Sequence, residues 1–153
     1  MFKIDGELKE YVESGVACLV ATGNAEGRPL VRMGWGPSVR EDGTTIDVYL
    51  ETARASETLA NLEDNGRIAM TVAHPVNYRS AQFKGTFKST GKPTDEERQR
   101  VEQHRGDFTV STSLIGDPPD IIANLWLDDV VRISFEVHEA FDQTPGPEAG
   151  KPL

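Results

Sequence analysis

The chain has 153 residues, enough for one domain with a single hydrophobic core, and its 16 basic against 25 acidic residues give a net charge of −9. This acidic balance argues against a nucleic-acid-binding protein, because such proteins use basic groups to contact phosphates. No apolar run approaches the roughly 20 residues of a membrane-spanning helix, and the first residues lack the apolar segment of a signal peptide. We therefore expect a cytoplasmic protein that binds neither membrane nor nucleic acid.

The residues most often used in catalysis and metal binding give few signals. Cys18 is the only cysteine and lies in an apolar run, so we expect a buried, unreactive thiol and no intrachain disulfide. His74, His104 and His138 are far apart in the sequence, which makes zinc a weak hypothesis. Nucleophile elbow, phosphate-loop and dinucleotide-binding patterns are absent from the sequence. If the protein is an enzyme, a bound cofactor is expected to carry the difficult chemistry.

The first two predicted elements are a helix and a strand. Residues 5–14 place Leu8, Tyr11 and Val12 on one face at helical spacing, which predicts a short amphipathic helix. Residues 16–22 are apolar on both faces, which predicts a strand in the centre of a sheet.

The next predicted strand, residues 30–39, is unusual because Gly34 and Gly36 flank Trp35. Glycine inside a strand marks a bulge, a bend at a barrel corner, or a place where a ligand approaches the backbone, and the sequence leaves these interpretations open. For Trp35 we favour packing or a dimer interface over stacking on a ligand ring.

Turn and capping residues predict where the next strands and helix begin and end. Asp42 and Gly43 predict a hairpin turn into an alternating strand, and Ser56 is the expected N-cap of a helix that Asn65 and Gly66 close. The predicted ranges are 44–50 for that strand, 52–65 for the helix, and 67–73 and 79–89 for two further strands.

Two helices are predicted in the C-terminal third. Thr94 and Glu97 match the pattern of a capping box at the start of a charged helix. Asp117 is expected to cap a second helix, with Pro118 in its first turn, that runs through Trp126.

The chain ends with a strand and a tail. Residues 130–139 alternate apolar and polar and predict the last strand. Residues 141–153 contain three prolines and two glycines, so this tail is expected to be a docked arm or disordered. Hairpin-linked strands with helices at the margins indicate an antiparallel barrel of the α+β class.

Several segments carry a family resemblance through their order and spacing. They are Arg32-Met33 on a strand after Gly27-Arg28-Pro29, Glu51-Thr52 at the end of the next strand, the helix 56–65 followed by Asn65-Gly66-Arg67-Ile68, and Arg79-Ser80-Ala81-Gln82-Phe83-Lys84-Gly85. On these segments the chain resembles the pyridoxamine 5′-phosphate oxidase-like FMN-binding split-barrel superfamily. The resemblance spans roughly residues 16–91 and returns over the last strand and its Phe141-Asp142-Gln143 exit.

The resemblance implies a six-stranded antiparallel split barrel that forms a homodimer, with FMN at the subunit interface. It also implies a flavin-dependent oxidoreductase that acts on an unidentified small organic substrate. The residues implied along the flavin ring are Arg32, Met33, Gly34 and Trp35, and those implied at the phosphate are Thr52, Arg54, Ser56 and Thr58. The residues implied on the neighbouring strand and on the C-terminal arm are Arg79, Ser80, Gln82 and Gln143.

The chain departs from the family pattern at the phosphate end, where Glu57 and Thr58 replace an Arg-Lys pair. Arg54 or Arg79 would then have to balance the phosphate charge, and these departures argue against oxidation of pyridoxamine phosphate itself. Surface ion pairs remain an alternative for Arg32 and Arg79, as does a plain helix cap for Ser56. Two other functions stay open: a non-catalytic binding module, and a relative that binds haem or a deazaflavin.

Overall fold

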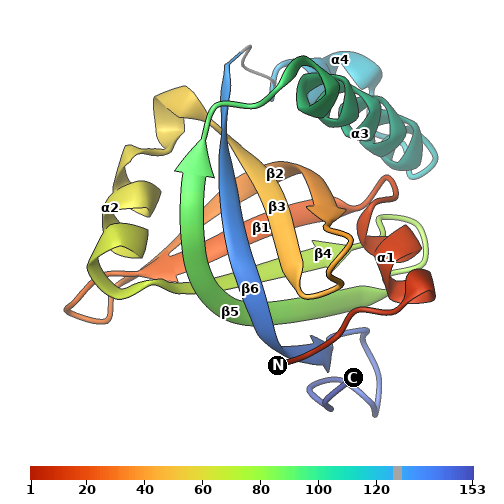
Figure 1. Ribbon diagram of the computed structural model, residues 1–153. Coiled ribbons are helices and arrows are strands. Elements are labelled where there is room, and N and C mark those ends of the chain that lie inside the picture. The colour runs from red at the N-terminus through yellow and green to blue at the C-terminus, as the bar shows by residue number, and fades with distance from the viewer. Residues whose placement is uncertain (126–128) are drawn as a thin grey trace.

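The computed structural model describes residues 1–125 and 129–153, which form a six-stranded barrel with helices at its margins (Figure 1). The strands are β1 (Ala17–Gly23), β2 (Pro29–Val39), β3 (Thr45–Glu51), β4 (Arg67–Ala73), β5 (Ser80–Gly91) and β6 (Val130–Asp142). The helices are α1 (Gly6–Val12), the 3₁₀ turn η1 (Thr52–Arg54), α2 (Ser56–Asn65), α3 (Asp95–Ser113) and α4 (Pro119–Ala123). The barrel closes in the order β1-β2-β3-β6-β5-β4 with antiparallel neighbours, which confirms the predicted α+β antiparallel barrel.

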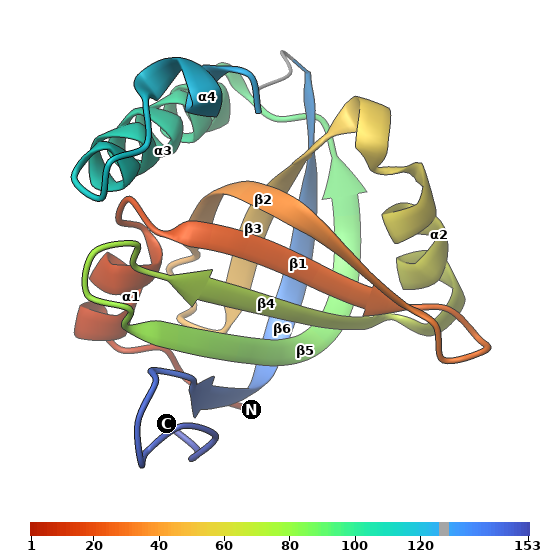
Figure 2. The same ribbon diagram turned by 180° about the vertical axis from the view of Figure 1, so that it is seen from behind.

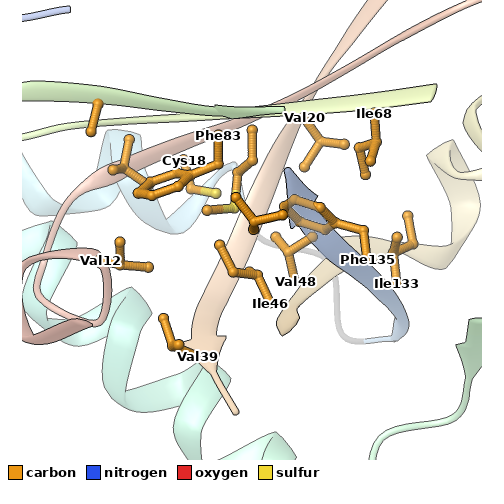
Figure 3. Close-up of a cluster of buried hydrophobic side chains, with 14 of the residues drawn as sticks. Val12, Cys18, Val20, Val39, Ile46, Val48, Ile68, Phe83, Ile133 and Phe135 are labelled. Carbon is orange, nitrogen blue, oxygen red and sulfur yellow. The ribbon is translucent and has the colours of Figure 1, made fainter. Parts of the chain in front are cut away.

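Inward-facing side chains of the strands fill the barrel, and Figure 3 shows labelled members of this core together with Val12. Ile46, Phe83 and Phe135 are fully buried, and Val12 of α1 also belongs to this cluster. Burying one such side chain stabilises the folded state by about 1.5–3 kcal/mol. Cys18 is also inside, which confirms the predicted buried thiol, and this burial raises the pKa of the thiol.

Strand β1 is central, as predicted, because it pairs with β2 on one side and β4 on the other, but its two apolar faces differ in burial. Cys18 and Val20 point into the barrel, whereas Leu19 on the opposite face is 42% exposed. A strand is buried on both faces only where a second layer covers its outer side, and no helix passes in front of β1 and β4 in Figure 2. The apolar outer face of β1 is therefore left open.

A β-bulge accounts for Gly36, the second of the two glycines around Trp35. The register of β2 against β3 shifts between Trp35 and Ser38, and Gly36 has φ +54°. A Cβ atom at Gly36 would lie 2.9 Å from Val101 Cγ2, because helix α3 packs directly on this backbone. The close approach that the glycine permits is thus to α3.

Helix α3 is held on the barrel by an aromatic cluster. Trp35 is 1% exposed and makes edge-to-face contacts with His104 and Phe108, with ring centroids 5.9 and 6.0 Å apart. The Gly36 amide donates to His104 Nδ1 at 3.0 Å, and His104 Nε2 lies 2.8 Å from the Val16 carbonyl oxygen. Trp35 therefore packs, as favoured from the sequence.

Two of the predicted helix boundaries are confirmed. Thr94 and Glu97 form a complete capping box at the start of α3. Gly66 follows α2 in the left-handed conformation, with φ +68°, and its amide donates to the Leu62 carbonyl oxygen.

Two predicted N-caps are wrong. Ala55 occupies the cap of α2 in a helical conformation, because η1 leads directly into the helix and leaves Ser56 in its first turn. Helix α4 begins at Pro119, because the residue before a proline is driven to extended backbone, and Pro118 rather than Asp117 is its cap. The helix ends at Ala123 with Asn124 as its C-cap, so the predicted continuation through Leu125 is wrong, and Trp126 lies outside the described residues.

The C-terminal tail docks on the chain's own barrel. Phe141 and Pro152 form a β-bridge, and the Leu153 amide donates to the Ala140 carbonyl oxygen at 2.9 Å. Of the two predicted states, the docked arm is the one observed. None of the described helices is long and apolar enough to cross a membrane.

Candidate functional site

A cleft of about 460 Å³ lies where β2, the end of β3, η1 and the start of α2 meet. We call it the Arg32 cleft; the residues used below are Arg32, Met33, Glu51, Arg54, Ser56 and Glu57. Arg32 and Met33 are adjacent on β2, whereas the other four follow β3 in the chain. The antiparallel pairing of β2 with β3 brings these two segments together.

Two arginines face two carboxylates in the Arg32 cleft. Arg54 Nε lies 3.3 Å from Oε2 of the buried Glu51, and Arg32 Nη2 lies 3.9 Å from Oε2 of Glu57. Arg32 Nε also donates to the Arg54 carbonyl oxygen at 3.2 Å. The Arg32–Glu57 pair is long and the Glu57 side chain is 65% exposed, so Arg32 can exchange this partner for a ligand at little cost.

The N-terminus of α2 opens at this cleft without a side-chain cap. Ala55 stands at the cap position and offers no hydrogen-bonding side chain to the helix. The first amides of a helix lack acceptors within the helix and carry partial positive charge, so they attract anions. Ser56 and Glu57, the first two residues of α2, line the cleft.

Four of the twelve predicted cofactor residues line the Arg32 cleft. These are Arg32, Met33, Arg54 and Ser56. The structure brings them together from two segments more than 20 residues apart. They supply two guanidinium groups, a hydroxyl and a helix N-terminus.

The other four residues predicted for the ring and phosphate do not line this cleft. A Cβ atom at Gly34 would meet Val48 and Cys18 of the core, and Trp35 packs under α3. The Thr52 amide donates to the Asp129 carbonyl oxygen, and a hydrogen bond from the Thr52 side chain lowers the pKa of the Asp129 carboxyl. Thr58 is 1% exposed, and its hydroxyl has no hydrogen-bond partner among the described residues.

The third predicted group, Arg79, Ser80, Gln82 and Gln143, gathers near α1 and the start of β5. The Arg79 guanidinium lies 4.4 Å from the Tyr11 ring centroid and 3.4 Å from Glu7 Oε1. The Gln143 amide donates to the Ser80 carbonyl oxygen at 2.8 Å. None of these residues lines the Arg32 cleft of the same chain.

Gln82 belongs to an outer sheet face that lacks charge at its centre. Strand pairing aligns outward-facing residues in rows across β2, β1, β4 and β5: Met33, Leu19, Thr71 and Gln82 form one row, and Ala17, Ala73 and Ser80 the next. Figure 2 looks onto these strands, and no helix passes in front of β1, β4 or the first part of β5. We call this surface the outer face.

The three histidines lie at separate places, and none lines the Arg32 cleft. His104 is buried under α3, His74 accepts a hydrogen bond from the Val76 amide, and His138 lies 2.9 Å from Thr86 Oγ1. Within residues 1–125 and 129–153, no three His, Cys, Asp or Glu side chains are grouped to hold a metal ion.

Glu51 and Leu125 are cleft residues that sequence reasoning did not assign to a site. Glu51 could have been found from its spacing, because Arg54 follows it by three residues and a carboxylate at a strand end needs such a partner. Leu125 carries no comparable signal, since only the tertiary structure brings the end of the α4 region to this cleft.

Comparisons with solved structures agree with the observed fold. An FMN-binding protein from Syntrophomonas wolfei is 15% identical with TM-score 0.56, and the match covers 90% of this chain and 87% of that one. An F420 reductase is 20% identical with TM-score 0.55, covering 86% and 94%. HutZ from Vibrio cholerae, described as a haem storage protein, is 17% identical with TM-score 0.52, covering 92% and 95%. At these identities the similarity shows the fold alone.

Sequence comparison assigns the family more firmly. No curated protein matches the chain by sequence. The family model described as pyridoxamine 5′-phosphate oxidase matches residues 4–127, which includes five of the six strands and the whole Arg32 cleft. The chain therefore belongs to the pyridoxamine 5′-phosphate oxidase family.

Proposed function

We propose that this protein is an FMN-binding oxidoreductase of its family, a homodimer that acts on a small organic substrate in the cytoplasm. The observation that carries the proposal is the Arg32 cleft, where two arginines and an uncapped helix N-terminus meet beside β2. Bound FMN would supply hydride transfer at its ring, and the chain would bind and orient it.

The residues of the cleft fit an anionic group. Arg32, Arg54, Glu51 and Glu57 sum to zero formal charge, so the favourable field comes mainly from the free amides at the start of α2. Arg32 is the cation best able to turn to a phosphate, because its pair with Glu57 is long and exposed. Arg54 would stay with the buried Glu51, whose charge needs a partner.

These contacts also revise how the phosphate charge would be balanced. Arg79 is engaged with Glu7 and Tyr11 near α1, so within one chain it would not reach an anion in the Arg32 cleft. Arg32 takes that place in the proposal. Glu57 remains an opposing charge, and Thr58 contributes no side-chain donor because it is buried.

The outer face supports a dimer. Leu19 and Val31 are 42% and 51% exposed on adjacent strands, surrounded by small or uncharged side chains. A contiguous apolar surface of this kind marks an interaction site. Met33 lies both in the outer-face rows and in the Arg32 cleft, so a second copy seated on this face would border the cleft. Ser80 and Gln82 of that copy are the predicted cofactor residues on the same face.

FMN is favoured over haem as the occupant of the Arg32 cleft. Iron in haem needs an axial ligand such as histidine, and none of the three histidines lines the cleft. His104 uses both ring nitrogens in hydrogen bonds to the backbone, so it is not free to bind iron. A deazaflavin remains the second candidate, since its phosphate would meet the same amides and arginine.

Titration of the purified protein with FMN, followed by flavin fluorescence, tests the proposal. We expect Arg32→Gln to weaken FMN binding about tenfold, because a charge-assisted hydrogen bond contributes about 1.5–3 kcal/mol and this one is partly exposed. Glu57→Gln should strengthen binding a few-fold by removing a like charge. Arg28→Gln, at an exposed arginine outside the Arg32 cleft, is the matched control and should leave binding unchanged.

Two outcomes would contradict the proposal. The first is a melting temperature that does not respond to excess FMN, since saturating a site at 100 times its Kd should stabilise the fold by about 2.7 kcal/mol. The second is equal FMN affinity for the wild type and Arg32→Gln. A response to a deazaflavin but not to FMN would establish the second candidate.

The dimer has its own test by light scattering. Leu19→Glu places a charge at the centre of the outer face and should give a monomer with weakened FMN binding. Val110→Glu, at a 61% exposed residue of α3, is the control and should remain dimeric. A wild-type protein that is monomeric at micromolar concentration would refute the dimer. A Leu19→Glu monomer with full FMN affinity would refute a cofactor shared between subunits.

A further inference from the structure

A second hollow, of about 480 Å³, lies on the outside of the barrel at the C-terminal end of β1. Strand pairing aligns Ala21 of β1, Ala69 of β4 and Lys84 of β5 across its floor. Arg67, two residues before Ala69 on the same face of β4, also lines it. We call this hollow the Arg67–Lys84 trough.

The floor of the trough is made of small groups. Gly23, Gly27 and Gly85 line it along with Ala21 and Ala69, so a flat or extended apolar body could lie close to the backbone. The lining is mainly apolar, with the charged groups supplied by a few long side chains. A site of this size and composition suits a small molecule.

The charged residues of the trough are mostly unpaired. Arg67 and Lys84 have no carboxylate within ion-pair distance among the described residues, although the chain has nine more acidic than basic residues. Lys84 instead lies 5.0 Å from the centroid of the Phe141 ring. Glu139 lines the trough opposite Lys84 but forms no ion pair with it, which leaves a net positive charge of one from these three side chains.

Two unpaired cations beside an apolar floor are complementary to an apolar anion. We propose that the Arg67–Lys84 trough is a second binding site, for a small molecule with an aromatic or aliphatic body and a carboxylate or sulfonate group. The body would lie over Ala21 and Ala69, and its anionic group would contact Arg67 and Lys84. This site shares no lining residue with the Arg32 cleft. Its floor continues the outer face, because Ala21 pairs with Val31 and Ala69 two residues along β1 from Leu19, so a second copy seated on the outer face would border the trough.

Two fluorescent probes of similar shape test the proposal: the anion anilinonaphthalene sulfonate and the neutral N-phenylnaphthylamine. We expect the anionic probe to bind the wild type at one site. The double variant Arg67→Gln/Lys84→Gln should bind this probe about tenfold more weakly, since each exposed charge contact contributes up to about 1 kcal/mol. The neutral probe should bind both proteins equally. Raising the salt concentration should weaken binding of the anionic probe to the wild type, which keeps both cations, but not to the double variant.

Three further variants locate the probe. Lys88→Gln removes a cation of the same strand that is paired with Glu136 outside the trough, and it should leave anion binding unchanged. Ala69→Phe fills the floor and should reduce binding of both probes. Arg32→Gln should have no effect, because Arg32 belongs to the other cleft.

Equal affinity of the anion for the wild type and the double variant would overturn the proposal. So would a loss of anion binding in Arg32→Gln, which would place the probe in the Arg32 cleft. Circular dichroism of each variant checks that the barrel is intact. The double variant changes only exposed side chains, so it keeps the test decisive even if Ala69→Phe does not fold.

Discussion

Protonation of His104 is the perturbation that most directly tests how α3 is attached to the barrel. Nδ1 accepts from the Gly36 amide, so the ring hydrogen is on Nε2 and donates to the Val16 carbonyl oxygen. A second proton on Nδ1 would face the Gly36 N–H, a donor against a donor. Burial lowers the pKa of His104 below its ordinary value of 6.5, and the hydrogen bond to the Val16 carbonyl and the charge of Asp107 oppose this shift only in part.

The sign of the pH dependence follows from proton binding. Below pH 6.5 the unfolded chain binds a proton at His104 and the folded chain does not, so the free energy of unfolding falls as the pH falls. The slope can reach about 1.4 kcal/mol per pH unit until the lower folded pKa is reached. Above pH 6.5 this contribution is fully present.

Urea unfolding between about pH 5.5 and 7.5, followed by tryptophan fluorescence, measures this slope. Trp35 contacts the His104 ring, which makes the fluorescence a direct reporter of this region. His104→Gln removes the titrating group and should flatten the slope relative to the wild type. His138→Gln, at a side chain that is 43% exposed, is the matched control and should keep it. Equal slopes for the wild type and His104→Gln would refute the reasoning.

Two further substitutions test the packing and the polar contacts of the barrel. Gly36→Ala should cost about 2–3 kcal/mol in urea unfolding, because φ is +54° and the new Cβ would lie 2.9 Å from Val101 Cγ2; a loss under about 0.5 kcal/mol would contradict the bulge geometry. Asp47→Asn should lower the free energy of unfolding by about 2 kcal/mol, because the carboxylate accepts two hydrogen bonds from Arg40 at 2.9 Å and one from Ser134 at 2.5 Å. A variant with unchanged stability would show that this network does not stabilise the barrel.

Part of the candidate site follows from local sequence order. Arg32 and Met33 on one strand, and Arg54 and Ser56 after the next, are joined through a single hairpin, so antiparallel pairing brings them together. Arg79 and its neighbours could not be placed in this way. They lie at and just before the start of β5, which is joined to β2 through β4 and β1, and β2, β3 and α2 separate β1 from β4 in the chain.

The errors at helix starts have the same origin. Ser56 is a good capping residue, but the cap position also requires extended backbone, and η1 gives Ala55 a helical conformation instead. Capping signals read from residue type predict the correct position only where the preceding backbone is extended. Thr94 meets this requirement, with φ −72° and ψ 170°, and forms the capping box that its sequence predicts.

The sequence by itself determined the elements of this protein, because hydrophobic period, turn residues and capping boxes act within a few residues of the chain. It determined the strands, the antiparallel class and the inward side of β3 and β5. The tertiary structure decided which surfaces of those elements are covered and by which other elements. Closure of the barrel left the apolar outer side of β1 uncovered, since a closed barrel has one interior, and α3 rather than a ligand came against Gly36. The Arg67–Lys84 trough exists only because β1 lies beside β4, a strand distant from it in the sequence.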